Sequence, residues 1–121
     1  MASQRAMTEA DAALERITQV PGIRGSLLIS GSDGLVVAER LMEGIDGRAI
    51  AALAASLVQR LDRATNRAGM RAPTFVHLKG NSGSVLAAPG RSDLVLVAVA
   101  STDANLGLAR MQMLDAVGRL V

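Results

Sequence analysis

The chain has 121 residues, a length that suits one compact core, so we expect a single domain over residues 1–121. Half of the residues are hydrophobic, yet Phe75 is the one aromatic residue, so the core must be built from aliphatic side chains. The net charge is only +2, with twelve arginines and one lysine against eleven acids, and this balance does not indicate nucleic-acid binding. The lack of cysteine excludes disulfides and thiolate metal sites. No apolar run approaches the roughly 20 residues that span a bilayer, so we expect a cytoplasmic protein without membrane insertion.

The N-terminal part of the chain predicts a short tail followed by a helix. Residues 1–7 are expected to be a disordered tail. Thr8 and Asp11 fit a helix N-cap and its reciprocal partner, in a weaker form of the capping box. The helix should stop at Pro21-Gly22, because proline cannot continue it.

A hairpin and a long helix are predicted next. Residues 26–30 and 35–40 read as strands on either side of Gly31-Ser32-Asp33-Gly34, where the glycines allow a tight reversal. Asp46 is a suitable N-cap for a second helix that runs to about Arg67. At 1.5 Å per residue this helix would be roughly 30 Å long.

The C-terminal half predicts a three-stranded meander and a closing helix. The strands are expected over residues 74–79, 84–88 and 94–100, with turns of glycine, asparagine, serine and proline between them. Residues 101–103 are three plausible caps for the last helix. The predicted order of elements is therefore αββαβββα.

The composition of the strands indicates a sheet that is covered on both faces. Residues 94–100, 27–29 and 35–38 are apolar without alternation, which is typical of strands with helices on both sides. We therefore expect an α/β (α+β) fold with a five-stranded sheet between helices. Five such strands offer more apolar surface than three helices of one small chain can cover, so a partner surface is implied.

The second helix carries an apolar arc that is too broad for one contact. The stripe expected to face the core consists of Ile50, Leu53, Ala54, Leu57, Leu61 and Ala64. A neighbouring stripe of small residues, favoured as the contact with a helix of a second subunit, consists of Ala51, Ala55 and Val58. The alternatives are a helix buried deeply in a monomer, or alanines that simply favour the helical state.

No catalytic, cofactor-binding or metal-binding set is recognisable. His77, the single histidine, lies on a predicted strand without the convergent partners that a triad or a zinc site requires. It is more readily interpreted as a structural or interface residue. Neither a GxxxxGK[ST] nor a GxGxxG motif occurs, so the chain is not expected to bind nucleotide itself or to need a cofactor.

Four arginines gather near the end of the second helix: Arg60, Arg63, Arg67 and Arg71. Such a cluster suits phosphate binding. Cations at a helix C-terminus also complement the helix dipole, and this interpretation is favoured, although an acidic protein partner remains open.

The order of these elements coincides with specific motifs. Residues 20–25 (VPGIRG) lead into an aliphatic strand, Asp33-Gly34 forms the hairpin, and Asn105-Leu106-Gly107 opens the last helix after a Val/Ala strand. Together with the long alanine-rich helix, they resemble the roadblock (dynein light chain) family over roughly residues 10–120. The resemblance implies a profilin-like, five-stranded antiparallel sheet with the second helix on one face and the other two helices on the opposite face. It also implies a homodimer whose sheets join edge to edge, through the strand at 74–79 and the second helix.

The prokaryotic, MglB-like members of that family look like partners of Ras-like small GTPases, whose hydrolysis the dimer stimulates; this chain departs from the longer MglB type by lacking extended tails. The resemblance thus implies a non-catalytic signalling regulator that binds such a GTPase and other signalling proteins. The alternatives are a passive dimeric scaffold and a small-molecule sensor. The residues expected at the dimer interface are Ala51, Ala55, Val58, Phe75 and His77. The residues expected to contact the GTPase are Ala52, Gln59, Arg60 and Arg63.

Overall fold

The computed structural model describes the backbone of residues 2–120 and the side chains of residues 8–120, and it confirms the order αββαβββα. The elements are α1 (Ala2–Thr18), β1 (Ile23–Ser30), β2 (Val36–Leu41), α2 (Gly47–Arg67), β3 (Val76–Lys79), β4 (Ser84–Pro89), β5 (Leu94–Ala100) and α3 (Leu106–Arg119). The first helix begins at Ala2, so Thr8 lies inside it instead of capping it. The backbone of residues 2–7, expected as a tail, is part of the same helix.

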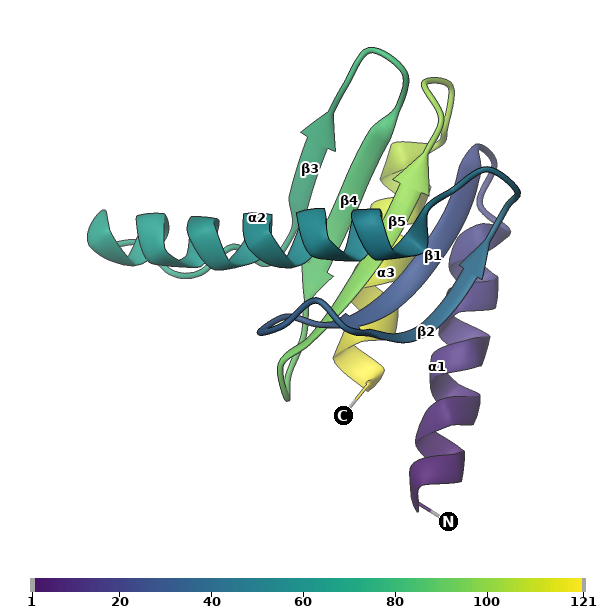
Figure 1. Cartoon of the computed structure of the whole chain (residues 1–121), viewed down its shortest axis with the longest axis horizontal. Helices are drawn as coiled ribbons and strands as arrows, with labels where there is room; N and C mark the ends of the chain where they lie inside the picture. The colour runs from purple at the N-terminus through teal and green to yellow at the C-terminus, as the bar shows by residue number, and fades with distance from the viewer. Residues whose placement is uncertain (1, 121) are drawn as a thin grey trace.

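The five strands form one antiparallel sheet in the order β2-β1-β5-β4-β3 (Figure 1). β1 and β5 lie at its centre and are buried along most of their length, as expected for strands between two helical layers. The same expectation is wrong for β2, where every position is half-buried or exposed and Val37 is 42% exposed. β2 is an edge strand with one neighbour, so it lies at the margin of the helical cover.

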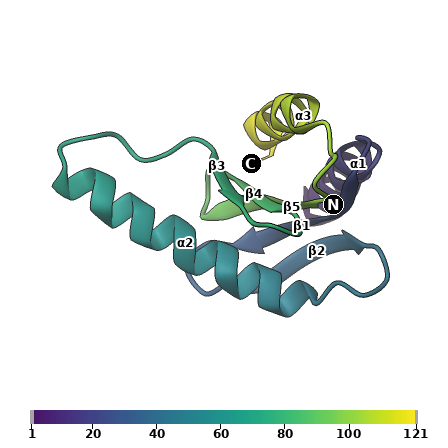
Figure 2. The same ribbon diagram turned by 90° about the horizontal axis from the view of Figure 1, so that it is seen from above.

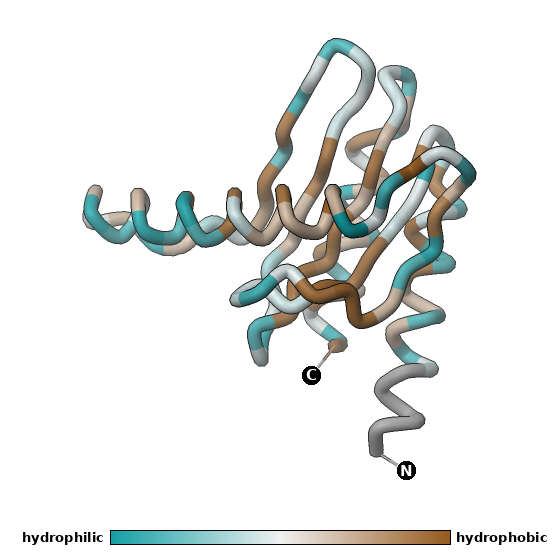
Figure 3. The backbone as a smooth tube through the Cα atoms, in the orientation of Figure 1, coloured by the Kyte–Doolittle hydropathy of each residue, from teal (hydrophilic) through white to brown (hydrophobic). Residues whose placement is uncertain are grey.

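The sheet separates two hydrophobic cores. Figure 2 shows α2 on one face and both α1 and α3 on the other, which confirms the expected layering. Because side chains alternate along a strand, Leu27 and Ile29 of β1 pack under α2 while Leu28 packs under the other two helices. The hydroxyl of Ser26, fully buried on β1, donates to the carbonyl oxygen of Leu14 at 3.0 Å and so joins α1 to the sheet. Figure 3 shows how the apolar residues gather along the strands.

The two apolar stripes of α2 do not divide as expected, because the core under α2 takes residues from both, with Ile50 and Ala54 from the stripe expected to face it. Ala51 and Ala55 are buried against the chain's own sheet, together with Ala54, and Val58 packs beside them. Leu53, expected in the core, is 43% exposed. The physical reason is the distance between α2 and the sheet. Alanine side chains let the helix backbone approach the sheet closely, whereas leucine side chains would hold it farther away. Ala51 and Ala55 therefore cannot provide the contact with a second subunit.

The ends of the two later helices are set by side-chain caps. Asp46 caps α2 as expected, since its carboxylate accepts a hydrogen bond from the backbone N–H of Ala49 at 3.1 Å. The cap of α3 is Asn105, whose side chain accepts from the N–H of Leu108 at 3.1 Å. The caps expected over residues 101–103 are therefore wrong, although Asn105 was part of the motif that opens this helix.

The C-terminal half of α2 extends beyond the sheet. Figures 1 and 2 show the helix crossing the sheet near β5 and continuing past the edge formed by β3. The distal end is hydrophilic in Figure 3. Among the residues that the structure describes, no strand lies beneath that end of the helix in either view.

Candidate protein-interaction surface

One edge of the sheet carries apolar side chains that the chain itself leaves open. Leu78 on β3 lies opposite Val85 on β4, on the face of the sheet that α2 occupies, and it is 41% exposed. Met70, just after α2, is 64% exposed. Leu57 and Leu61 are only partly buried on the same flank of α2 as Leu53, because positions i, i+4 and i+8 share one side of a helix. We call the set Leu53, Leu57, Leu61, Met70 and Leu78 the β3-edge surface.

Phe75 and His77, expected at the dimer interface, lie on or beside the edge strand β3. Phe75 is partly buried against the α1/α3 core, and the guanidinium carbon of Arg110 stands 5.6 Å from the centroid of its ring. His77 is exposed, with its Nε2 atom 2.9 Å from the hydroxyl oxygen of Ser84 on the neighbouring strand. Both residues border the open edge, and their place in a dimer stays a prediction.

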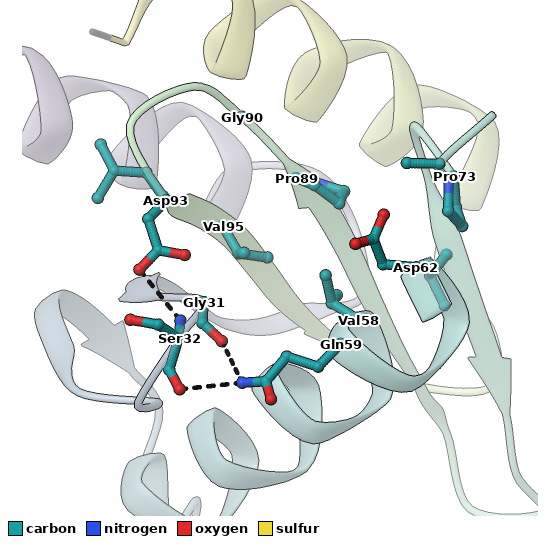
Figure 4. Close-up of a pocket in the computed structure, with 13 residues that line it drawn as sticks. Gly31, Ser32, Val58, Gln59, Asp62, Pro73, Pro89, Gly90, Asp93 and Val95 are labelled. Atoms are coloured by element: carbon teal, nitrogen blue, oxygen red, sulfur yellow. Dashed lines mark hydrogen bonds between the residues drawn. The ribbon is translucent and has the colours of Figure 1, made fainter. Parts of the chain in front are cut away.

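Gln59 has a role inside the chain that the sequence pattern did not indicate. Its side-chain amide donates hydrogen bonds to the carbonyl oxygens of Gly31 at 2.6 Å and of Ser32 at 3.0 Å (Figure 4). These bonds clamp the β1–β2 turn to the middle of α2. Gln59 is one of the residues expected to contact a GTPase, but in the structure its side-chain amide is engaged in these two hydrogen bonds within the chain.

The other three residues expected to contact a GTPase, Ala52, Arg60 and Arg63, are exposed on α2. Within the side chains that the structure describes, the one ion pair joins Arg119 to Asp115. Arg63 makes a single long contact, from its Nε to the carbonyl oxygen of Gln59 at 3.4 Å. The guanidinium groups of Arg60 and Arg63 are thus available to an acidic partner.

A cavity of about 400 Å³ lies on the other flank of α2, beneath the start of its overhang. We call it the α2 cavity. Its apolar walls come from α2, β3 and β5, and from the segment that leads into β3: Val58, Pro73, Val76 and Val95. The carboxyl groups of Asp62 and Asp93 also line it, and no lysine or arginine does (Figure 4).

The two carboxylates of the α2 cavity differ in their bonding. Hydrogen bonds from the hydroxyl and backbone N–H of Ser32, and from the hydroxyl of Ser30, lower the pKa of Asp93 below its ordinary value. The Ser32 N–H lies 3.1 Å and the Ser30 hydroxyl 3.0 Å from the same oxygen. Asp62 is exposed; its backbone carbonyl oxygen accepts a hydrogen bond from the hydroxyl of Thr65 at 3.0 Å, while its carboxylate has no hydrogen bond or ion pair among the described side chains. Asp93 therefore anchors the β1–β2 turn, while Asp62 is free to meet an incoming group.

Within the part of the chain that the structure describes, no three histidine, cysteine or acidic side chains come close enough to hold a metal ion. Over the same residues, no helix combines the length and apolar character needed to cross a membrane.

Comparison with known proteins decides the family. Residues 9–100 match the Roadblock/LC7 domain. The chain belongs to the Roadblock/LC7 family. An uncharacterised protein of Methanocaldococcus jannaschii is 28% identical over 110 residues, which cover 91% of this chain and 95% of that relative.

Two solved structures share the fold of this Roadblock/LC7 chain. Myxococcus xanthus MglB has a TM-score of 0.81 at 22% identity, with 91% of this chain and 83% of that one covered. A Roadblock/LC7 domain from Streptomyces avermitilis has a TM-score of 0.78 at 23% identity, with 88% and 90% covered. The expected family and the expected fold are both confirmed.

Proposed function

We propose that this Roadblock/LC7 chain is a non-catalytic, cytoplasmic homodimer that binds a Ras-like small GTPase and modulates its cycle. The observation that carries the proposal is the β3-edge surface together with the overhang of α2. In the described part of one chain, β3 has a neighbouring strand on one side and the end of α2 extends past the sheet. A second copy would supply the other neighbour of β3 and a surface for the end of α2. The dimer would then present two α2 helices side by side as one platform.

The two edges of the sheet are not equivalent, and this favours β3 for the contact. β2 carries a register shift opposite Leu28 and Ile29. Such irregularities protect an edge from further pairing. β3 is paired to β4 without a shift. A second copy would therefore join the sheet at β3.

The outward side of α2 supports the choice of an acidic protein partner. Arg60 and Arg63 lie one helical turn apart and have no carboxylate partner among the described side chains. A guanidinium group pairs with a carboxylate through two parallel hydrogen bonds, which suits a specific protein contact. Ala52, which is exposed earlier on α2, leaves room for the partner to approach.

Affinity purification from the native cell, followed by binding assays with the recovered GTPase in its GDP and GTP states, tests the proposal. Arg60→Glu combined with Arg63→Glu should abolish binding while dimer mass and thermal stability stay nearly unchanged, since exposed substitutions cost within about 0.5 kcal/mol. Arg16→Glu combined with Arg91→Glu changes the net charge equally at exposed positions away from α2 and serves as the matched control. Binding that ignores the nucleotide state would favour the passive scaffold instead. Full affinity in the α2 double variant would place the partner on another surface.

A further inference from the structure

We propose that the α2 cavity is a binding site for a small organic cation, a molecule with an apolar body and a protonated amine. This site goes beyond the proposed function, because every residue that lines the cavity belongs to one chain and no second copy is needed to build it. Three features of the cavity carry the inference: its walls, its free carboxylate and the engagement of its side-chain donors.

The walls of the α2 cavity suit the apolar body of a small molecule. Val58 of α2, Val76 of β3 and Val95 of β5 line it, together with Pro73 and Pro89. The volume of the cavity is about 400 Å³. Binding pockets for small molecules have volumes of about 300–1,000 Å³, with mostly apolar walls and a few polar groups. Because the three valines also pack in the core under α2, these walls are in place before a ligand arrives.

The free charged group of the cavity is the carboxylate of Asp62 on α2. Figure 4 shows this side chain extending from the helix into the space between Pro73 and Pro89, which also line the cavity. The carboxylate has no hydrogen bond or ion pair among the described side chains, and no lysine or arginine lines the cavity. A carboxylate in this position favours a cationic ligand, which can form a charge-assisted hydrogen bond with it.

The second carboxylate, that of Asp93, does not make the cavity a metal site. One of its oxygens already accepts hydrogen bonds from the backbone N–H of Ser32 at 3.1 Å and from the hydroxyl of Ser30 at 3.0 Å. Within the residues that the structure describes, no three histidine, cysteine or acidic side chains gather to hold a metal ion. The charge of Asp62 is therefore available to an organic cation.

The side-chain donors around the cavity are already engaged. Among the residues that line it, Ser32 and Gln59 are the two with donor side chains. The hydroxyl of Ser32 bonds to Asp93, and the amide nitrogen of Gln59 donates to two carbonyl oxygens of the β1–β2 turn. Pro73 and Pro89 have no backbone N–H to offer. An anionic ligand would thus lack a side-chain partner, whereas an ammonium group brings its own donors.

Phenethylamine and phenylacetate are a matched pair of probes, because they are similar in size and opposite in charge at neutral pH. In isothermal titration of the full chain, we expect phenethylamine to bind saturably, one molecule per chain, in the millimolar range that is usual for so small a ligand. Phenylacetate should not bind. Absence of saturable phenethylamine binding, or equal binding of the two probes, would overturn the proposal.

Asp62→Asn keeps the size of the side chain and removes its charge, so phenethylamine should bind at least about tenfold more weakly. Asp62 is exposed and its bond from Thr65 goes to the backbone, so the variant should keep the fold, as a thermal melt followed by circular dichroism can verify. Asp11→Asn, at an exposed position on α1, removes the same charge away from the cavity and should leave the affinity unchanged. Equal affinities in the two variants would contradict the role of Asp62.

The position of the bound probe has its own readout. In a heteronuclear NMR titration, we expect phenethylamine to shift the backbone amide signals of Gly31 and Gly90, which line the cavity from two turns. Shifts confined to other parts of the surface would overturn the assignment of the site. Failure of this proposal is distinguishable from failure of the proposed function, since the probes require neither a second copy of the chain nor a GTPase.

Discussion

Replacing Ala55 by glutamate tests which side of α2 faces the sheet. Ala55 is 4% exposed and packs with apolar side chains of β1 and β5. The larger side chain must overpack this core, at about 1–3 kcal/mol. Its carboxylate must also be ionised without a partner or be held neutral, which costs several kcal/mol more. Because the whole stability of a small domain is about 5–15 kcal/mol, we expect Ala55→Glu to unfold much of the protein at room temperature.

Leu53→Glu is the matched control on the same helix. Leu53 is 43% exposed, so the glutamate stays in water and the free energy of unfolding should change by less than about 1 kcal/mol. We expect this variant to keep its helical circular dichroism and to weaken the dimer, because Leu53 belongs to the β3-edge surface. Urea unfolding followed by circular dichroism is the suitable assay, since the chain has no tryptophan or tyrosine. A stable, dimeric Ala55→Glu variant beside an unfolded Leu53→Glu variant would show that the arrangement of α2 described here is wrong.

Further outcomes follow from single contacts. Gln59→Ala removes both hydrogen bonds to the β1–β2 turn and should lower the free energy of unfolding by about 1–2 kcal/mol, as measured by urea unfolding. The pKa of the Asp93 carboxyl is lower in the folded than in the unfolded state, so Asp93 stabilises the fold at pH values above its unfolded-state pKa. This contribution to the free energy of unfolding should be lost as the pH falls through the folded-state pKa of Asp93. Asp93→Asn should therefore flatten that part of the pH–stability profile. Gly22→Ala should lower the melting temperature by several degrees, because Gly22 has a φ of 89° and a Cβ there would clash with the Cα of Ala104. Isothermal titration with GTP and Mg²⁺ should show no heat above dilution, and saturable binding would contradict the regulator role.

Local chemistry predicted most of the fold. The turns at residues 31–34 and 80–83 and the cap at Asp46 were visible because glycine and aspartate perform these tasks through backbone contacts close in sequence. The meander followed from three apolar runs with short connections, and β3, β4 and β5 are indeed neighbours. The burial of β2 was overestimated because a central strand and an edge strand can carry the same apolar run. Only the number of neighbouring strands in the sheet distinguishes the two.

The sequence by itself determined the order of the elements, the aliphatic nature of the core and the lack of any recognisable nucleotide-binding motif. The tertiary structure alone decided which flank of α2 meets the sheet, because periodicity measures the width of an apolar arc and not the distance at which a helix packs. It also decided the role of Gln59, whose partners Gly31 and Ser32 lie 28 and 27 positions away in the chain. The α2 cavity and the open edge of β3 were also decided by the tertiary structure alone, since both depend on which segments that are distant in sequence lie together in space.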